Sequence, residues 1–258
     1  LITAHQNLAT PANALGLKKG AFPMSRDVVE AFEVLAEVDR DTFLPHLASA
    51  LNNYAALAAQ SGRRKEALAT FRRAREMFEE LAARDPDVFL PRIAGVFDNI
   101  SILLGEMGKQ KEGLAAARRA VEIFERLVQR DADAYLPDLA KAVRNLAARL
   151  VGVGQHTEAL AASERAVELT ERIAEVNPDP VLMELVIAVH NHAVILALLG
   201  RGEEASAAAR RARELYGQAV QVNPDVANAK LESSLNQFPN QLSEIKRLKE
   251  VQAAAERA

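Results

Sequence analysis

Apolar residues recur at helical spacing in two consecutive stretches of the chain, separated by a polar loop. The first stretch has an apolar residue every three or four positions, at Leu44, Leu47, Leu51, Tyr54 and Ala58. After the loop 60–63, a second apolar stripe runs through 64–83 and contains Ala67, Leu68, Phe71, Ala74, Phe78 and Leu81. This spacing puts apolar side chains on one face of an α-helix. The pattern therefore predicts two helices joined by a short turn.

The helical pair is repeated along the chain. The segment Phe43-Leu44-Pro45 has counterparts that begin 46 residues apart and without a gap, at Phe89, Tyr135 and Val181. The same step relates an asparagine of the first helix and a glycine of the loop, at Asn53, Asn99, Asn145 and Asn191 and at Gly62, Gly108, Gly154 and Gly200. Glycine just past a helix end often adopts a positive φ, so each loop glycine is expected to end the first helix. Self-similarity at such a period indicates a repeat array.

The repeats define the domain organisation. A partial repeat occupies 1–42, full repeats occupy 43–88, 89–134, 135–180 and 181–226, and a C-terminal capping helix or pair of helices occupies 227–258. All belong to one solenoid domain, because a single hairpin cannot bury both of its apolar stripes and must stack on its neighbours. In 227–258, Pro239 predicts one kinked helix or two short ones over the last hairpin. The alternative is that this amphipathic segment fills a groove or pairs with a second copy.

The repeat resembles the tetratricopeptide repeat (TPR) family. That family keeps small residues at fixed places in both helices, and the chain has Ala55, Ala67 and Ala74 there. It lacks the family's tryptophan, and its 46-residue period exceeds the usual 34. Such long repeats resemble those of kinesin light chains and of bacterial multidomain signalling proteins that join repeats to caspase-like proteases or nucleotide-switch modules. The resemblance implies an all-α, right-handed superhelical solenoid of stacked antiparallel helical hairpins, whose first helices line a concave groove.

The repeated asparagines lie almost opposite the apolar stripe of the first helix. The resemblance therefore implies that Asn53, Asn99, Asn145 and Asn191 form a ladder along the groove. Each side chain has an amide donor and a carbonyl acceptor, so it can bind both the C=O and the N–H of an extended peptide. The alternatives are that each asparagine ties its helix to a neighbouring carbonyl, or that it persists from duplication of the repeats.

Other charged and polar residues are predicted beside the asparagines or on the second helices. The groove set is completed by Ser49, Asn52, Arg92, Asp98, Lys141, Arg144 and His190. Lys141 and Arg144 form a basic pair that suits a carboxylate or phosphate of a ligand, or an intrahelical pair with Asp138. On the second helices an arginine stands three residues before a glutamate in every full repeat, at Arg73, Arg119, Arg165 and Arg211. These arginines form either an anion-binding stripe or ion pairs on a solvated outer face.

Composition and motifs narrow the function classes. The 258 residues carry 32 basic and 35 acidic side chains, a formal net charge of -3 that disfavours a nucleic-acid partner. The absence of cysteine excludes disulfides and thiolate chemistry. There is no run of about 18 apolar residues, so no membrane partner is expected. The chain begins at Leu1 without a signal-peptide pattern, and the expectation is a piece of a longer, cytoplasmic protein.

No chemistry-bearing motif is recognised in the sequence. His190 and His192 point apart on a helix and cannot chelate one ion together. The glycines of the loops follow no strand, so they form no phosphate-binding loop. The expectation is a non-enzymatic chain with no catalytic residue, cofactor or metal site.

These features together predict a protein–protein interaction module, part of a larger bacterial sensor or scaffold, whose groove binds an extended peptide or a flexible protein segment. The alternative is a structural or self-associating spacer that positions or restrains an effector domain, such as a protease or nucleotide-switch module, outside these residues. Peptide affinity favours the first function. A mass that rises with concentration, without peptide affinity, favours the second.

Overall fold

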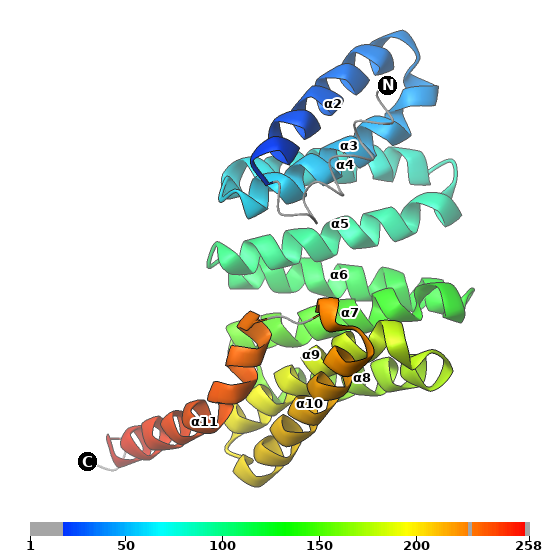
Figure 1. Cartoon of the computed structure of the whole chain (residues 1–258). Coiled ribbons are helices and arrows are strands. Elements are labelled where there is room, and N and C mark those ends of the chain that lie inside the picture. The colour runs from blue at the N-terminus through cyan, green and yellow to red at the C-terminus, as the bar shows by residue number, and fades with distance from the viewer. Residues whose placement is uncertain (1–17, 227–228, 256–258) are drawn as a thin grey trace. The chain divides into compact units, whose positions relative to one another are not determined.

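A computed structural model describes residues 18–226 and 229–255, which are helical almost throughout (Figure 1). The helices are α2 (Lys18–Val38), α3 (Arg40–Gln60), α4 (Arg64–Ala82), α5 (Pro86–Glu106), α6 (Gln110–Val128), α7 (Ala132–Gly152), α8 (His156–Val176), α9 (Pro178–Leu199), α10 (Gly202–Val222) and α11 (Ala229–Ala255), with a short 3₁₀ turn, η1 (Pro224–Val226), before α11. The described residues contain no strand. The prediction of an all-α array of helical hairpins is therefore confirmed.

The chain divides into two compact units, Leu1–Ile123 and Phe124–Ala258, with the boundary inside α6. In unit 1, α2 packs on α3, α3 packs on α4, and α4 packs on α5. In unit 2 the same holds from α7 through α11. Consecutive helices within a unit run antiparallel (Figure 1). Both neighbouring helices of the chain thus pack against each of α3, α4, α8, α9 and α10.

Aspartates start the first helix of three repeats earlier than the apolar stripe indicates. The carboxylates of Asp39, Asp85 and Asp131 accept hydrogen bonds from backbone N–H groups three residues on, over 3.2, 3.4 and 3.0 Å. A carboxylate there satisfies one of the unpaired N–H groups of the first turn. The aspartate that follows one hairpin therefore begins the next, and Pro86 is the first residue of α5.

The loop glycines have the predicted backbone conformation. Gly62, Gly108, Gly154 and Gly200 have φ values of 78°, 75°, 78° and 84°. These are left-handed conformations, which a side chain disfavours. A Cβ added at Gly154 would meet no atom within 4 Å. The positive φ therefore favours glycine at this position, and steric crowding does not.

Replacing two neighbouring glycines with alanine is expected to change the free energy of unfolding differently. Gly154→Ala places a side chain at positive φ and should lower the free energy of unfolding by about 1 kcal/mol. Gly152 is the last residue of α7, where alanine is the better helix former, so Gly152→Ala should leave stability unchanged or raise it. Urea unfolding midpoints of the two variants check this. Equal midpoints would show that the loop conformation is not what selects glycine.

Helix α11 covers the end of the stack in unit 2. Leu235 and Phe238 are 1% and 2% exposed, and each joins an apolar cluster on α9 and α10. The helix continues through Pro239, so it is one helix and not two. Proline has no N–H to donate to the carbonyl of Leu235, and the guanidinium of Arg213 on α10 donates to that carbonyl over 3.0 Å instead. Residues 227–228 and 256–258 of this segment lie outside the described residues.

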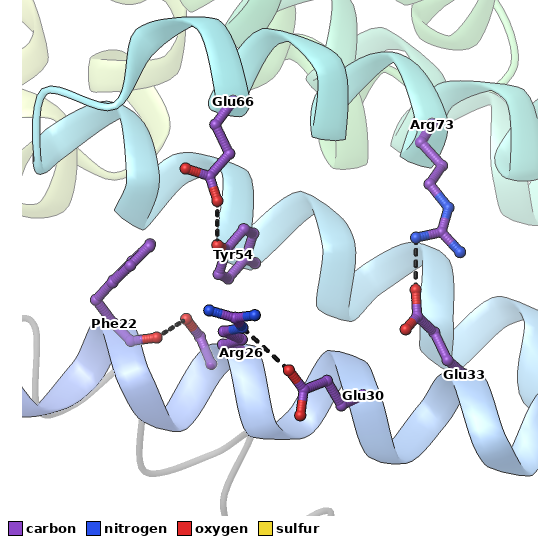
Figure 2. A network of polar contacts seen from close by, with 8 residues as sticks. Phe22, Arg26, Glu30, Glu33, Tyr54, Glu66 and Arg73 are labelled. Carbon is purple, nitrogen blue, oxygen red and sulfur yellow. Dashed lines mark hydrogen bonds and ion pairs between the residues drawn. The ribbon is translucent and has the colours of Figure 1, made fainter.

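The arginines of the second helices are held in ion pairs. Three of them reach a glutamate on the preceding second helix, in the pairs Arg73–Glu33, Arg165–Glu125 and Arg211–Glu171, and Arg119 pairs with Glu122 of its own helix. Figure 2 shows the first of these, between α4 and α2. All are solvent-accessible, so each contributes little to stability. Of the two predicted roles, this arrangement matches paired charges on an outer face.

Helices α5 and α9 are long and apolar enough to cross a membrane, judged by length and composition alone. Their mean hydropathies reach 1.4 and 1.9 over 18 residues. Nearly half of that stretch in α5, and 56% of it in α9, is buried inside the structure. Packing between neighbouring helices accounts for the buried part of these stretches, which are apolar on average but are not unbroken apolar runs.

Candidate functional site

A polar hollow of about 460 Å³ lies between α3, α4 and α5 in unit 1. It brings together five of the predicted groove residues, Ser49, Asn52, Asn53, Arg92 and Asn99. His46, Phe78, Pro91, Gly95 and Val96 complete the lining. Because side chains 40 and more residues apart meet there, the repeat, and not local sequence, builds this site.

The polar groups of this hollow are partly satisfied within the chain. The Nδ2 of Asn99 donates to Oδ1 of Asn52 over 3.4 Å, and the hydroxyl of Ser49 donates to the carbonyl of Pro45 over 2.9 Å. Asn53 is exposed. Arg92 is also exposed, and no acidic side chain among the described residues pairs with it. The hollow thus presents amide and guanidinium groups to solvent, with an excess of donors.

Four of the predicted groove residues share one repeat position, and three of the four contact the following repeat or α11. Asn52 accepts from Asn99, Arg144 of α7 pairs with Glu184 of α9, and His190 of α9 contacts Ser234 of α11. Asp98, the fourth, is 4% exposed, and His190 is 6% exposed. The prediction that Asp98 and His190 line an open groove is wrong. It treated each helix alone, whereas the side next to the asparagine turns towards the following repeat.

His190 is buried under α11 with one ring nitrogen unpaired. Its Nε2 lies 3.0 Å from the hydroxyl of Ser234, its ring meets that of Phe238 edge-on at 5.9 Å, and its Nδ1 has no partner. Burial lowers the pKa of His190 below its usual value. His190 therefore contacts α11 as the neutral imidazole.

Stability of the α11 contact is expected to fall as pH falls. The unfolded chain binds a proton on His190 more readily than the folded chain, so folding loses free energy below the ordinary histidine pKa. Lowering the pH from about 7.5 to about 5.5 should speed hydrogen exchange in α11, and less so in His190→Asn. The exposed His46→Asn variant is the control. An equal acid response in the wild type and both variants would contradict this role of His190.

The second predicted cluster of charges lines a smaller hollow in unit 2. About 180 Å³ in volume, it lies between α7, α8 and α9 and includes Asp138, Lys141, Arg144 and Glu184. Arg144 pairs with Glu184 and not with Asp138 of its own helix. The basic pair of the sequence analysis is therefore partly neutralised by the next repeat. Asn145 follows Arg144 on α7, and Asn191 lies seven residues after Glu184 on α9. Both side chains are half-buried.

The family profile of a Domain of Unknown Function (DUF3856) matches residues 93–223. The match spans just over half of the chain. The chain belongs to the DUF3856 family. No curated protein is significantly similar in sequence to this DUF3856 member.

Solved structures with a similar fold cover most of this DUF3856 chain. BtubC (BKLC) from P. vanneervenii is 20% identical, with a TM-score of 0.66 over 84% of this chain and 80% of that one. A variant of a Podosopora anserina putative kinesin light chain with nearly identical TPR-like repeats is 16% identical, with a TM-score of 0.65 over 85% and 96%. A thermophilic TPR protein of Thermus thermophilus is 17% identical, with a TM-score of 0.53 over 92% and 98%. The predicted TPR fold, with repeats like those of kinesin light chains, is confirmed.

The apolar part of the unit 2 hollow was not predicted from the sequence. Thr170 and Val181 line it, together with Pro137, Ala140 and Ile173. Val181 was recognised only as the counterpart of Phe43, and Thr170 was not recognised at all. The signal that finds them is a small residue where other repeats have an aromatic ring.

Proposed function

We propose that the repeats form a protein-interaction module, within a larger sensor or scaffold protein, whose first helices bind an extended peptide or a flexible protein segment. The observation that carries the proposal is the hollow of unit 1, where Asn53, Asn99 and Arg92 meet from two successive repeats. Polar groups gathered in a concavity that the chain does not fill are typical of a binding surface. The TPR fold of the relatives supports a protein or peptide as the partner.

The asparagines suit a ligand main chain better than a particular side chain. Asn99 uses one amide N–H on Asn52 and keeps its carbonyl and its second N–H, and Asn53 is exposed. The two side chains come from equivalent positions of consecutive repeats, so each can bind a successive peptide unit of one extended segment. Specificity then depends on neighbouring groups, of which Arg92 is charged and exposed in unit 1.

Selection from a random displayed peptide library, followed by calorimetric titration of the enriched peptides, tests this function. The expected result is saturable binding that weakens in Asn53→Ala, with Gln60→Ala, an exposed polar residue at the end of the same helix, as the control. Absence of any enriched peptide, together with a mass that rises with concentration in light scattering, would contradict the proposal and favour a self-associating spacer.

A further inference from the structure

Aromatic pairs fill the junction between successive repeats in unit 1. Phe32 of α2 and Phe43 of α3 have ring centroids 6.5 Å apart, and Phe78 of α4 and Phe89 of α5 have centroids 6.3 Å apart. Both pairs occupy the same two repeat positions, one near the end of a second helix and one at the start of the next first helix. A pair of rings at this separation packs favourably, and Phe78 forms an aromatic wall of the unit 1 hollow.

The same two positions carry small residues at one junction of unit 2, between α8 and α9, whereas the preceding junction has Phe124 and Tyr135 there. Two repeats after Phe78 and Phe89, the chain has Thr170 on α8 and Val181 on α9. The hollow of about 180 Å³ is found at this junction, with Ile173 beside them in its lining. The hydroxyl of Thr170 donates to the carbonyl of Ala166 over 2.7 Å, so it needs no partner from a ligand. The hollow is therefore lined by Thr170 where the corresponding hollow of unit 1 is lined by the ring of Phe78.

The volume and the apolar lining of the hollow favour an aromatic side chain as its ligand. A protein cavity of about 150 Å³ lined by aliphatic side chains admits a benzene molecule, so about 180 Å³ suffices for one phenyl ring. Asp138, Lys141 and Arg144 stand on the α7 side, at the repeat positions of His46, Ser49 and Asn52. The apolar space is thus reached from the same helix surface as the polar hollow of unit 1, and its surroundings are charged.

We propose that this hollow is an anchor pocket that binds one phenyl-sized side chain of the bound peptide, between Thr170, Ile173 and Val181. This inference rests on the proposed function for its peptide. The pocket itself depends only on the two aromatic residues that are replaced at the junction of α8 and α9. An isolated ring on a small molecule should therefore enter it weakly, whether or not a peptide ligand is known.

The test uses N-acetylphenylalanine amide as the probe and methyl NMR as the readout. In protein labelled at isoleucine and valine methyl groups, the signals of Ile173 and Val181 should shift with saturation, and N-acetylalanine amide should leave them in place. Thr170→Phe with Val181→Phe restores the pair seen at Phe78 and Phe89. This filled variant should bind the probe at least tenfold more weakly with an unchanged helical circular dichroism spectrum.

Val181→Phe alone serves as a second filled variant if the double variant does not fold. Enriched peptides should share one aromatic residue, and its replacement by alanine should weaken binding to the wild type at least tenfold but hardly affect binding to the filled variant. Unmoved methyl signals of Ile173 and Val181, or equal probe affinity in the filled variants, would overturn the pocket. Peptides that bind without an aromatic requirement would then leave the proposed function standing without the pocket, whereas probe binding without any peptide ligand would contradict the function alone.

Discussion

Replacing Phe238 with alanine is expected to release α11 from the end of unit 2. The ring is 2% exposed and packs with Ala193, Leu196 and Ala209 in a cluster that has no other aromatic residue. Truncating a buried phenylalanine removes apolar contacts and leaves a cavity, which costs about 3–5 kcal/mol. Few other contacts hold this helix, so the loss should appear as local opening and not as global unfolding.

Hydrogen exchange by mass spectrometry measures that opening. Peptides from α11 should exchange much faster in Phe238→Ala, whereas peptides from α3 and α4 in unit 1 should keep the wild-type rate. The exposed neighbour gives the matched control, because Gln237→Ala removes a polar side chain from the same turn. Unchanged exchange in α11 would show that Leu235 and the apolar residues beyond Pro239 hold the helix without the ring.

The double variant Asn99→Ala with Asn145→Ala is expected to bind a selected peptide at least tenfold more weakly, a loss of about 1.4 kcal/mol. Each asparagine removed deletes up to two hydrogen bonds to the ligand main chain, and each such bond contributes about 1 kcal/mol. One substitution lies in each unit. The fold should persist, because both side chains are half-buried and neither belongs to the apolar core.

Calorimetric titration of one peptide against wild type and double variant measures this effect. The control is Asn177→Ala, which removes an asparagine at the start of α9 whose side chain makes no capping bond. Its affinity should match the wild type. Equal affinity in a folded Asn99→Ala, Asn145→Ala variant would remove the ladder from the account and support the view that these asparagines serve contacts between repeats, as the bond from Asn99 to Asn52 does.

The fold could be predicted because its determinants are local and repeated. Helical periodicity, a glycine at positive φ and a 46-residue step each specify the same hairpin, and the structure has it at every repeat. The apolar stripe does not mark the start of each first helix, because it begins after the first turn. The capping bond of Asp85 to the N–H of Val88 sets the actual start.

The site was predictable only in part, because it depends on how repeats stack. Ser49, Asn53 and Asn99 line one hollow, because Asn53 and Asn99 are equivalent residues of successive repeats and Ser49 lies one turn before Asn53. His190 is buried because α11 covers it. Since α11 departs from the repeat, the spacing of residues along α9 alone could not predict this burial. The void at Thr170 likewise depends on the volume of residues across a junction and not on polarity along a helix.

The most direct test of the central claim is a proton–nitrogen NMR spectrum of the asparagine side-chain amides, recorded with and without a selected peptide. The account predicts that the NH₂ signals of Asn53, Asn99, Asn145 and Asn191 shift on binding, while that of Asn223, whose carbonyl accepts from the N–H of Asp225, stays in place. A peptide that binds and leaves the four signals unmoved would show that the ladder does not contact the ligand and would contradict the account.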